Sequence, residues 1–183
     1  TLDAVIKRNP EKISLSGTPS LLKKAVKEKK IAAMFGVEGG HMIENKLDNL
    51  NNFYNRGVRY MTLTWNNSTD WASSAWDETI NADKLKQKGL TDFGKQVIRR
   101  MNELGMIIDV SHVGEQTFYD AIAVTNKPII ASHSCVHALC SVPRNLKDEQ
   151  IKAIGKNGGV IHLNFYSGFI DSSYDRRSDI FNS

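Results

Sequence analysis

The stretch that decides the fold is residues 31–40, with the sequence IAAMFGVEGG. Its first seven residues are apolar or glycine, and the run stops at Glu38, which two glycines follow. A short apolar run bounded by polar and glycine residues is typical of a strand buried on both faces, as in parallel sheets. We therefore expect a buried strand over residues 31–37, with Glu38 at its carboxyl end.

Four more stretches of this kind follow along the chain, and helical patterns separate them. The other expected strands are residues 58–64, 106–110, 129–131 and 160–165. Repeated alternation of strands and helices implies βαβ units and a parallel sheet. Because crossovers are right-handed, two architectures remain, an open doubly wound sheet or a closed (β/α)8 barrel. A complete barrel takes ~250 residues, so this chain of 183 residues, interpreted as one domain, could supply only part of one.

The helical segments carry recognisable start and stop signals. The expected helices are residues 18–30, 47–56, 91–104, 115–124 and 145–154. Thr91 is the expected cap of the third and Gly105 its end, while Asn145 is the expected cap of the last. Residues 65–89 show little periodicity, and loops of that length in a compact domain are usually functional or disordered.

Composition and charge exclude several classes of protein. The chain has 24 Lys and Arg against 20 Asp and Glu, a net charge of +4 spread along the sequence, which does not indicate a nucleic-acid partner. Cys135 and Cys140 form neither a disulfide framework nor a zinc-ribbon pattern. No apolar run approaches the ~20 residues that span a bilayer, so we expect any membrane association to use segments outside these residues. The sequence is compatible with a cytoplasmic or a cell-envelope location.

The candidate chemistry lies where the expected strands end. Glu38 ends the first strand, His112 follows the third, and His133 follows the fourth. In parallel α/β sheets the residues just past the carboxyl ends of the strands line the active site, so these three side chains should converge. Imidazole and carboxylate together suit Zn²⁺, and a carboxylate can bridge two metals.

Each of the three residues also has a plainer interpretation. A single histidine after a strand is more often a capping or core hydrogen-bonding residue than a ligand, and Glu38 could cap the helix that follows it. Their shared position favours a metal site without identifying the reaction. His162, within an apolar strand, is expected to be a packed, hydrogen-bonded residue.

A set of short motifs carries a resemblance to a known family. They are Glu38-Gly39-Gly40-His41-Met42-Ile43, Leu50, Tyr54, Gly57-Val58-Arg59-Tyr60-Met61, Leu63-Thr64, Gly89-Leu90-Thr91, Phe93-Gly94, Met101-Asn102, Asp109-Val110-Ser111-His112, Ser132-His133-Ser134 and Arg144-Asn145. At these spacings the sequence resembles the membrane (renal) dipeptidase family, peptidase family M19, over about residues 31–169.

The resemblance implies a (β/α)8 TIM-type barrel, of which this chain would supply about five central to late βα units. It implies two zinc ions and hydrolysis of the peptide bond of dipeptides by a metal-bridging water. Glu38 would bridge the ions and act in catalysis, and His112 and His133 would bind the second ion. Arg144 would bind the carboxylate of the substrate, a task that suits a forked guanidinium.

Three features depart from the family pattern. The first zinc of the family also takes a His-x-Asp pair, and no histidine precedes residue 31. A late aspartate of the family would follow residue 183. Trp65 stands where many relatives have a histidine near the scissile bond, so Trp65 is expected to contact substrate but cannot perform imidazole chemistry.

These features lead to a zinc-dependent dipeptidase as the predicted function, with a small dipeptide as substrate and a homodimer as a possible assembly. The alternative is a non-catalytic fragment or pseudoenzyme of the same barrel family that binds at most one zinc. A third hypothesis keeps the chemistry but assigns another small amide as the substrate.

Overall fold

Five parallel strands form the central sheet of the computed structural model, which describes residues 2–171 and 173. The strands are β3 (Phe35–Glu38), β4 (Val58–Thr62), β5 (Ile107–Asp109), β6 (Ile130–Ala131) and β7 (Val160–Ile161). Each strand pairs in parallel with the next one along the chain. A doubly wound sheet would reverse its strand order at a switch point, whereas this order never reverses, as in a (β/α)8 barrel. The fold is therefore a partial TIM-type barrel, as the family resemblance implies.

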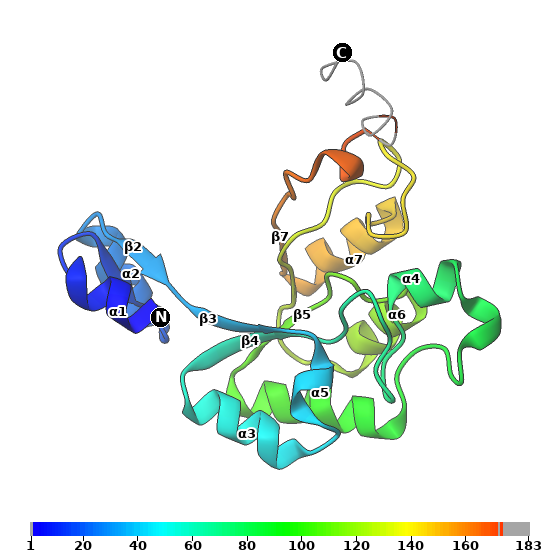
Figure 1. Ribbon diagram of the computed structural model, residues 1–183, viewed down its shortest axis with the longest axis horizontal. Helices are drawn as coiled ribbons and strands as arrows, with labels where there is room; N and C mark the ends of the chain where they lie inside the picture. The colour runs from blue at the N-terminus through cyan, green and yellow to red at the C-terminus, as the bar shows by residue number, and fades with distance from the viewer. Residues whose placement is uncertain (1, 172, 174–183) are drawn as a thin grey trace.

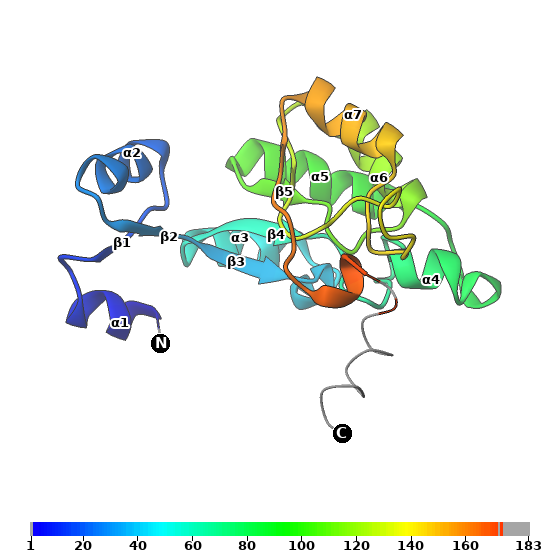
Figure 2. The same cartoon turned by 90° about the horizontal axis from the view of Figure 1, so that it is seen from above.

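Four helices connect these strands and cover one side of the sheet (Figures 1 and 2). They are α3 (Leu47–Asn55), α5 (Asp92–Leu104), α6 (Glu115–Val124) and α7 (Asp148–Asn157). The core lies between this helical layer and the sheet, where Leu50, Met101 and Phe118 are fully buried. Among the described residues, no helix is both long and apolar enough to cross a membrane.

The helix α5 begins and ends where the sequence predicts. The side chain of Thr91 accepts a hydrogen bond from the Gly94 amide, at 3.1 Å, and so caps the first turn. Gly105 ends the helix in the left-handed region, with φ of 73°, which glycine adopts without steric cost. Both signals are local, which is why the sequence alone was sufficient to find this helix.

The stretch 31–37 is not one strand buried on both faces, and that prediction is wrong. It forms two strands, β2 (Ile31–Ala33), which pairs in parallel with β1 (Ile13–Leu15), and β3, which opens the main sheet. Exposure alternates along β3, and Ile31 is 66% exposed. The described strands form one wall of a barrel, so no opposite wall among them covers their inner face.

The N-terminal residues form a small unit beside the sheet, at the left of Figure 1. It consists of α1 (Leu2–Arg8), β1, α2 (Pro19–Lys27) and β2. The helix α2 begins after Thr18 as predicted, whereas α1 and β1 were not predicted from the sequence. Arg59 of β4 fastens this unit to the sheet, because its Nε donates to the carbonyl oxygen of Gly17 at 2.7 Å.

Two predictions near the C-terminal part of the sheet are also wrong. Asn145 does not cap a helix, because α7 begins only after Lys147. The side chain of Asn145 instead accepts from the Cys135 amide and donates to the carbonyl oxygens of Cys140 and Phe169. His162 lies past the end of β7, and its side chain is exposed rather than packed.

The remaining described elements are short. They are α4 (Ala75–Thr79) and the 3-10 helices η1 (Gly40–Ile43), η2 (Ala82–Lys84) and η3 (Ser167–Phe169).

Candidate metal centre

The carboxyl ends of β3, β5 and β6 bring three side chains to one point. Glu38 is the last residue of β3, and His112 and His133 follow β5 and β6. The Nε2 atom of His112 lies 3.0 Å from Oε1 of Glu38 and 2.9 Å from Nε2 of His133. The third side of this triangle, from Glu38 Oε1 to His133 Nε2, is 3.2 Å. The sequence predicts this convergence from the ends of the strands, and the structure has it.

The chemistry and spacing of this triangle fit a zinc ion. Two imidazole nitrogens and one carboxylate oxygen are ligands that zinc commonly takes. Tetrahedral ligands at zinc distances of ~2.0–2.1 Å lie roughly 3.3 Å from one another. The three observed separations are close to that value, and these residues form a group that could hold a metal ion.

The protonation state of His112 also suits a ligand. Burial, together with the nearby charges of Arg144 and His133, lowers the pKa of His112 to about 3. The imidazole of His112 is therefore neutral at pH 7, and only a neutral ring offers a lone pair to a metal. The side chain of Glu38 is 51% exposed and that of His112 only 7%, so the centre opens to solvent on the Glu38 side.

The backbone at His112 is held in an unusual conformation. Its φ is 71°, in the left-handed region that residues other than glycine rarely adopt. The amide of Ala75 donates to the carbonyl oxygen of His112 at 2.8 Å, and Oδ1 of Asn66 lies 3.0 Å from its Nδ1. Both partners belong to the long segment 65–89, so this segment fixes the backbone and the ring of a candidate ligand.

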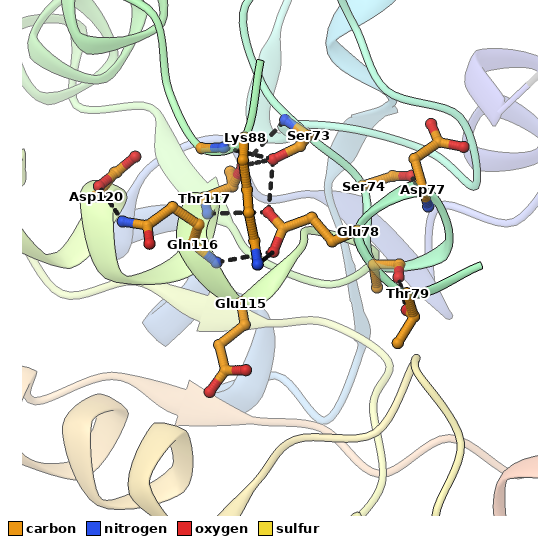
Figure 3. Close-up of polar contacts among 12 residues, drawn as sticks. Ser73, Ser74, Asp77, Glu78, Thr79, Lys88, Glu115, Gln116, Thr117 and Asp120 are labelled. Carbon is orange, nitrogen blue, oxygen red and sulfur yellow. Dashed lines mark hydrogen bonds and ion pairs between the residues drawn. The ribbon is translucent and has the colours of Figure 1, made fainter. Parts of the chain in front are cut away.

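Figure 3 shows how the same segment is fastened to the start of α6. The side chain of Glu78 is 5% exposed, and Ser73 Oγ donates to its carboxylate at 2.5 Å. The same carboxylate accepts from the backbone amides of Gln116, at 3.1 Å, and Thr117, at 3.4 Å. Glu78 thus supplies the cap that Gly114, the residue before α6, lacks, and a carboxylate is favoured at the positive end of a helix.

Arg144 is a buried cation beside the centre. It is 8% exposed, its Nη2 donates to the carbonyl oxygen of His133 at 3.4 Å, and its guanidinium lies 5.3 Å from the centroid of the Phe169 ring. Burial lowers the pKa of Arg144 to about 10, so the group stays charged at pH 7. Within the part of the chain that the structure describes, no carboxylate forms an ion pair with it. A cavity of about 120 Å³ is lined by both Arg144 and His112.

Trp65 lies beside His112 and is itself exposed. The two ring centroids are 6.4 Å apart, and Trp65 is 46% exposed. All five residues proposed from the sequence therefore gather at one edge of the sheet, and their chemical roles stay predictions. Asn66 and Glu78 could not be identified from the sequence, because their partners lie 46 and 38 positions away and no local spacing signals such contacts.

Comparisons with known proteins agree with this architecture. The family model described as membrane dipeptidase (peptidase family M19) matches residues 1–180. The uncharacterized dipeptidase C965.12 of Schizosaccharomyces pombe is 40% identical over 151 residues, which are 82% of this chain and 36% of that protein.

Two solved structures share the fold. The probable dipeptidase PvdM of Pseudomonas aeruginosa is 26% identical, with a TM-score of 0.82, over 99% of this chain and 47% of that one. A metallo peptidase of Rhodobacter sphaeroides, liganded with a phosphinate mimic of the dipeptide L-Ala-D-Ala, is 24% identical, with a TM-score of 0.81, over 92% of this chain and 48% of that one. The chain thus spans about half the length of these structures. On the match to its family model and the identity to its fungal relative, the chain belongs to the membrane dipeptidase family, peptidase family M19.

Proposed function

We propose that this chain carries the second-zinc ligands and the substrate-binding arginine of a zinc-dependent dipeptidase. The observation that carries the proposal is the triangle of Glu38 Oε1, His112 Nε2 and His133 Nε2, with sides of 2.9–3.2 Å. These three residues would hold the ion. When bound there, zinc would polarise the scissile carbonyl and lower the pKa of a coordinated water.

Glu38 is proposed to serve two ions in the complete site. It faces both imidazoles through Oε1, and among the described residues no hydrogen bond is made to its Oε2. A carboxylate with one free oxygen on an exposed side chain can reach a second cation. We therefore propose two zinc ions per complete active site, the first of them completed by a His-x-Asp pair as in the family.

Arg144 is proposed to bind the free carboxylate of a dipeptide. A buried guanidinium without a carboxylate partner is costly in the free protein and gains a partner when an anion enters. Anchoring the terminal carboxylate near the ion would place the adjacent peptide bond at the metal, which favours dipeptides over longer chains. Trp65, which is exposed beside His112, would pack against the substrate without taking part in proton transfer.

The second candidate is a pseudoenzyme that binds at most one zinc. It is favoured by one observation, that the described residues contain a single group of three candidate metal ligands. The two candidates differ in whether dipeptides are hydrolysed once a His-x-Asp pair is supplied to the chain of 183 residues.

Bound zinc per chain, measured by plasma mass spectrometry after dialysis, tests the proposal. We expect about one zinc per wild-type chain and none in His112→Ala. His137→Ala is the matched control, because the side chain of His137 contacts Ser141 and lies outside the triangle. Absence of zinc from the wild-type chain after zinc is added back would contradict the proposal, as would equal loss in the control. Hydrolysis of L-Ala-D-Ala by the protein supplied with the pair then separates the dipeptidase from the pseudoenzyme.

A further inference from the structure

Asp109 is a buried carboxylate that no proposed step uses. It is the last residue of β5 and is fully buried. Its Oδ1 accepts from the backbone amides of Ser111 and Ser132, at 3.0 and 2.9 Å. Its Oδ2 accepts from the hydroxyls of Thr62, at 2.6 Å, and Ser132, at 2.5 Å. Four donors from three strand ends therefore converge on one carboxylate, which acts only as an acceptor.

The hydroxyl of Ser132 stands between Asp109 and a candidate metal ligand. Its oxygen lies 2.7 Å from Nδ1 of His133. A serine hydroxyl has one proton, and here that proton is donated to Asp109. The oxygen of Ser132 can then only accept from His133, so the ring proton of His133 must be on Nδ1. In the neutral ring the lone pair is then on Nε2, the atom that faces Glu38.

The ring of His112 is held in the same Nδ1-protonated tautomer by a different contact. Its Nδ1 faces the side-chain carbonyl Oδ1 of Asn66, which accepts but cannot donate. Its ring proton is therefore also on Nδ1, and its Nε2 offers a lone pair to the same point as that of His133. The two rings are set by unrelated contacts, one from the 65–89 segment and one from the strand ends.

We propose that Asp109 is a positioning residue that acts through Ser132 to hold His133 in the Nδ1-protonated tautomer required of a metal ligand. The acceptor chain runs from His133 through Ser132 to Asp109 and orients the ring as a carboxylate or carbonyl partner does in many metal sites. The value of this tautomer for zinc binding rests on the proposed function. The tautomer itself does not, because it is a property of the metal-free protein.

Asp109→Asn provides the sharpest test, because it should reverse the chain of hydrogen bonds. The oxygen of the new side-chain amide would stay with the two backbone N–H groups, and its NH₂ group would face the hydroxyls of Thr62 and Ser132. Ser132 would then accept from this NH₂ group and donate to His133, which would move the ring proton from Nδ1 to Nε2. An analogous exchange of carboxylate for amide is known to select the wrong histidine tautomer in serine proteases.

The readout is the ¹⁵N spectrum of the imidazoles in the metal-free protein, which distinguishes protonated from unprotonated ring nitrogens. We expect Nδ1-protonated His133 in the wild type, Nε2-protonated His133 in Asp109→Asn, and a mixture in Ser132→Ala. Thr62→Val is the matched control, since it removes one donor to Asp109 without touching Ser132, and it should leave the tautomer unchanged. His112 should be unchanged in all of these variants.

A wild-type His133 whose Nδ1 carries no proton would overturn the proposal, as would a tautomer unaffected by both Asp109→Asn and Ser132→Ala. Should Asp109→Asn fail to fold, Ser132→Ala alone decides. Zinc affinity, measured by competition with a chromophoric chelator, should fall ~10–100-fold in both variants. If the imidazole spectra show the expected tautomers but the wild type binds no zinc, the proposed function fails while this inference holds.

Discussion

Glu38 and His112 lie 74 positions apart in the sequence, yet Oε1 of one and Nε2 of the other are 3.0 Å apart. Parallel strands explain this proximity, because the residues at the carboxyl ends of β3 and β5 lie at the same edge of the sheet. The contact also joins two of the three proposed metal ligands.

Trp65 should report the arrival of a metal at His112. Its ring centroid lies 6.4 Å from that of His112, so a cation bound by His112 will alter the environment of the indole. We expect zinc titration to change the tryptophan fluorescence of the wild-type chain, and Trp65→Phe to remove most of that change. Trp76→Phe is the matched control, since Trp76 is similarly exposed, at 47%, and makes no ring contact with His112. An equal signal in Trp65→Phe would contradict this geometry.

Arg144→Met should weaken substrate binding. Calorimetric affinity for L-Ala-D-Ala should fall at least ~10-fold, since the charge-assisted hydrogen bonds to its carboxylate are lost. Arg56→Met is the control, because Arg56 is exposed, and it should leave this affinity unchanged. Tight binding by Arg144→Met would show that the carboxylate is bound elsewhere.

Gly114→Ala should destabilise the protein, because the added Cβ would collide with the side chain of Glu78. A second substitution, at Glu78, should remove the collision. A Cβ at Gly114 would overlap the carboxylate of Glu78, although the backbone of Gly114, with φ of −67°, suits any residue. We expect a loss of ~1–3 kcal/mol in the free energy of unfolding, measured with urea.

The cost of Gly114→Ala should largely vanish in a Glu78→Ala background, so the double-mutant cycle should show a strong coupling. Gly155→Ala is the control, because a Cβ there meets nothing within 4 Å in the helix α7. It should stabilise the protein by ~0.5–1 kcal/mol. Additive effects of the substitutions at Gly114 and Glu78 would contradict the proposed contact.

Asp77 should make stability fall at acidic pH. Burial raises the pKa of Asp77, but hydrogen bonds from Ser68, Asn81 and Ser74 outweigh burial and lower the pKa below its usual value. A carboxyl whose pKa is lowered by folding stabilises the native state above its unfolded pKa of ~3.9, and this contribution is lost as pH falls through the folded value.

Asp77→Asn should therefore be less stable than the wild type at pH 7, and the difference should shrink below about pH 4. Urea unfolding at a series of pH values measures it. Asp92→Asn is the control, because the side chain of Asp92 is 92% exposed. A difference between Asp77→Asn and the wild type that does not depend on pH would sink this explanation.

Local signals explain which parts of the fold were predictable. Thr91 and Gly105 bound α5 through contacts within a few residues, so the sequence alone places that helix. Glu38 and His133 were predictable for a second reason, since strand ends share an edge in any parallel sheet.

The features that could not be predicted from the sequence depend on contacts with residues far away along the chain. Asparagine is a residue type that often caps helices, but the side chain of Asn145 forms hydrogen bonds with Cys135, Cys140 and Phe169 instead. Phe169 lies 24 positions away in the sequence. A Cβ added at Gly114 would collide with Glu78 because of the path that the 65–89 segment takes. The sequence of that segment has no periodicity from which this path could be predicted.

X-ray absorption at the zinc edge of the metal-loaded chain tests the central claim most directly, because it identifies the ligand atoms. We expect two imidazole nitrogens and oxygen ligands at ~2.0–2.2 Å in the wild type, and one imidazole fewer in His133→Ala. Sulfur ligands at ~2.3 Å, which would implicate Cys135 or Cys140, or a spectrum that His133→Ala leaves unchanged, would contradict it.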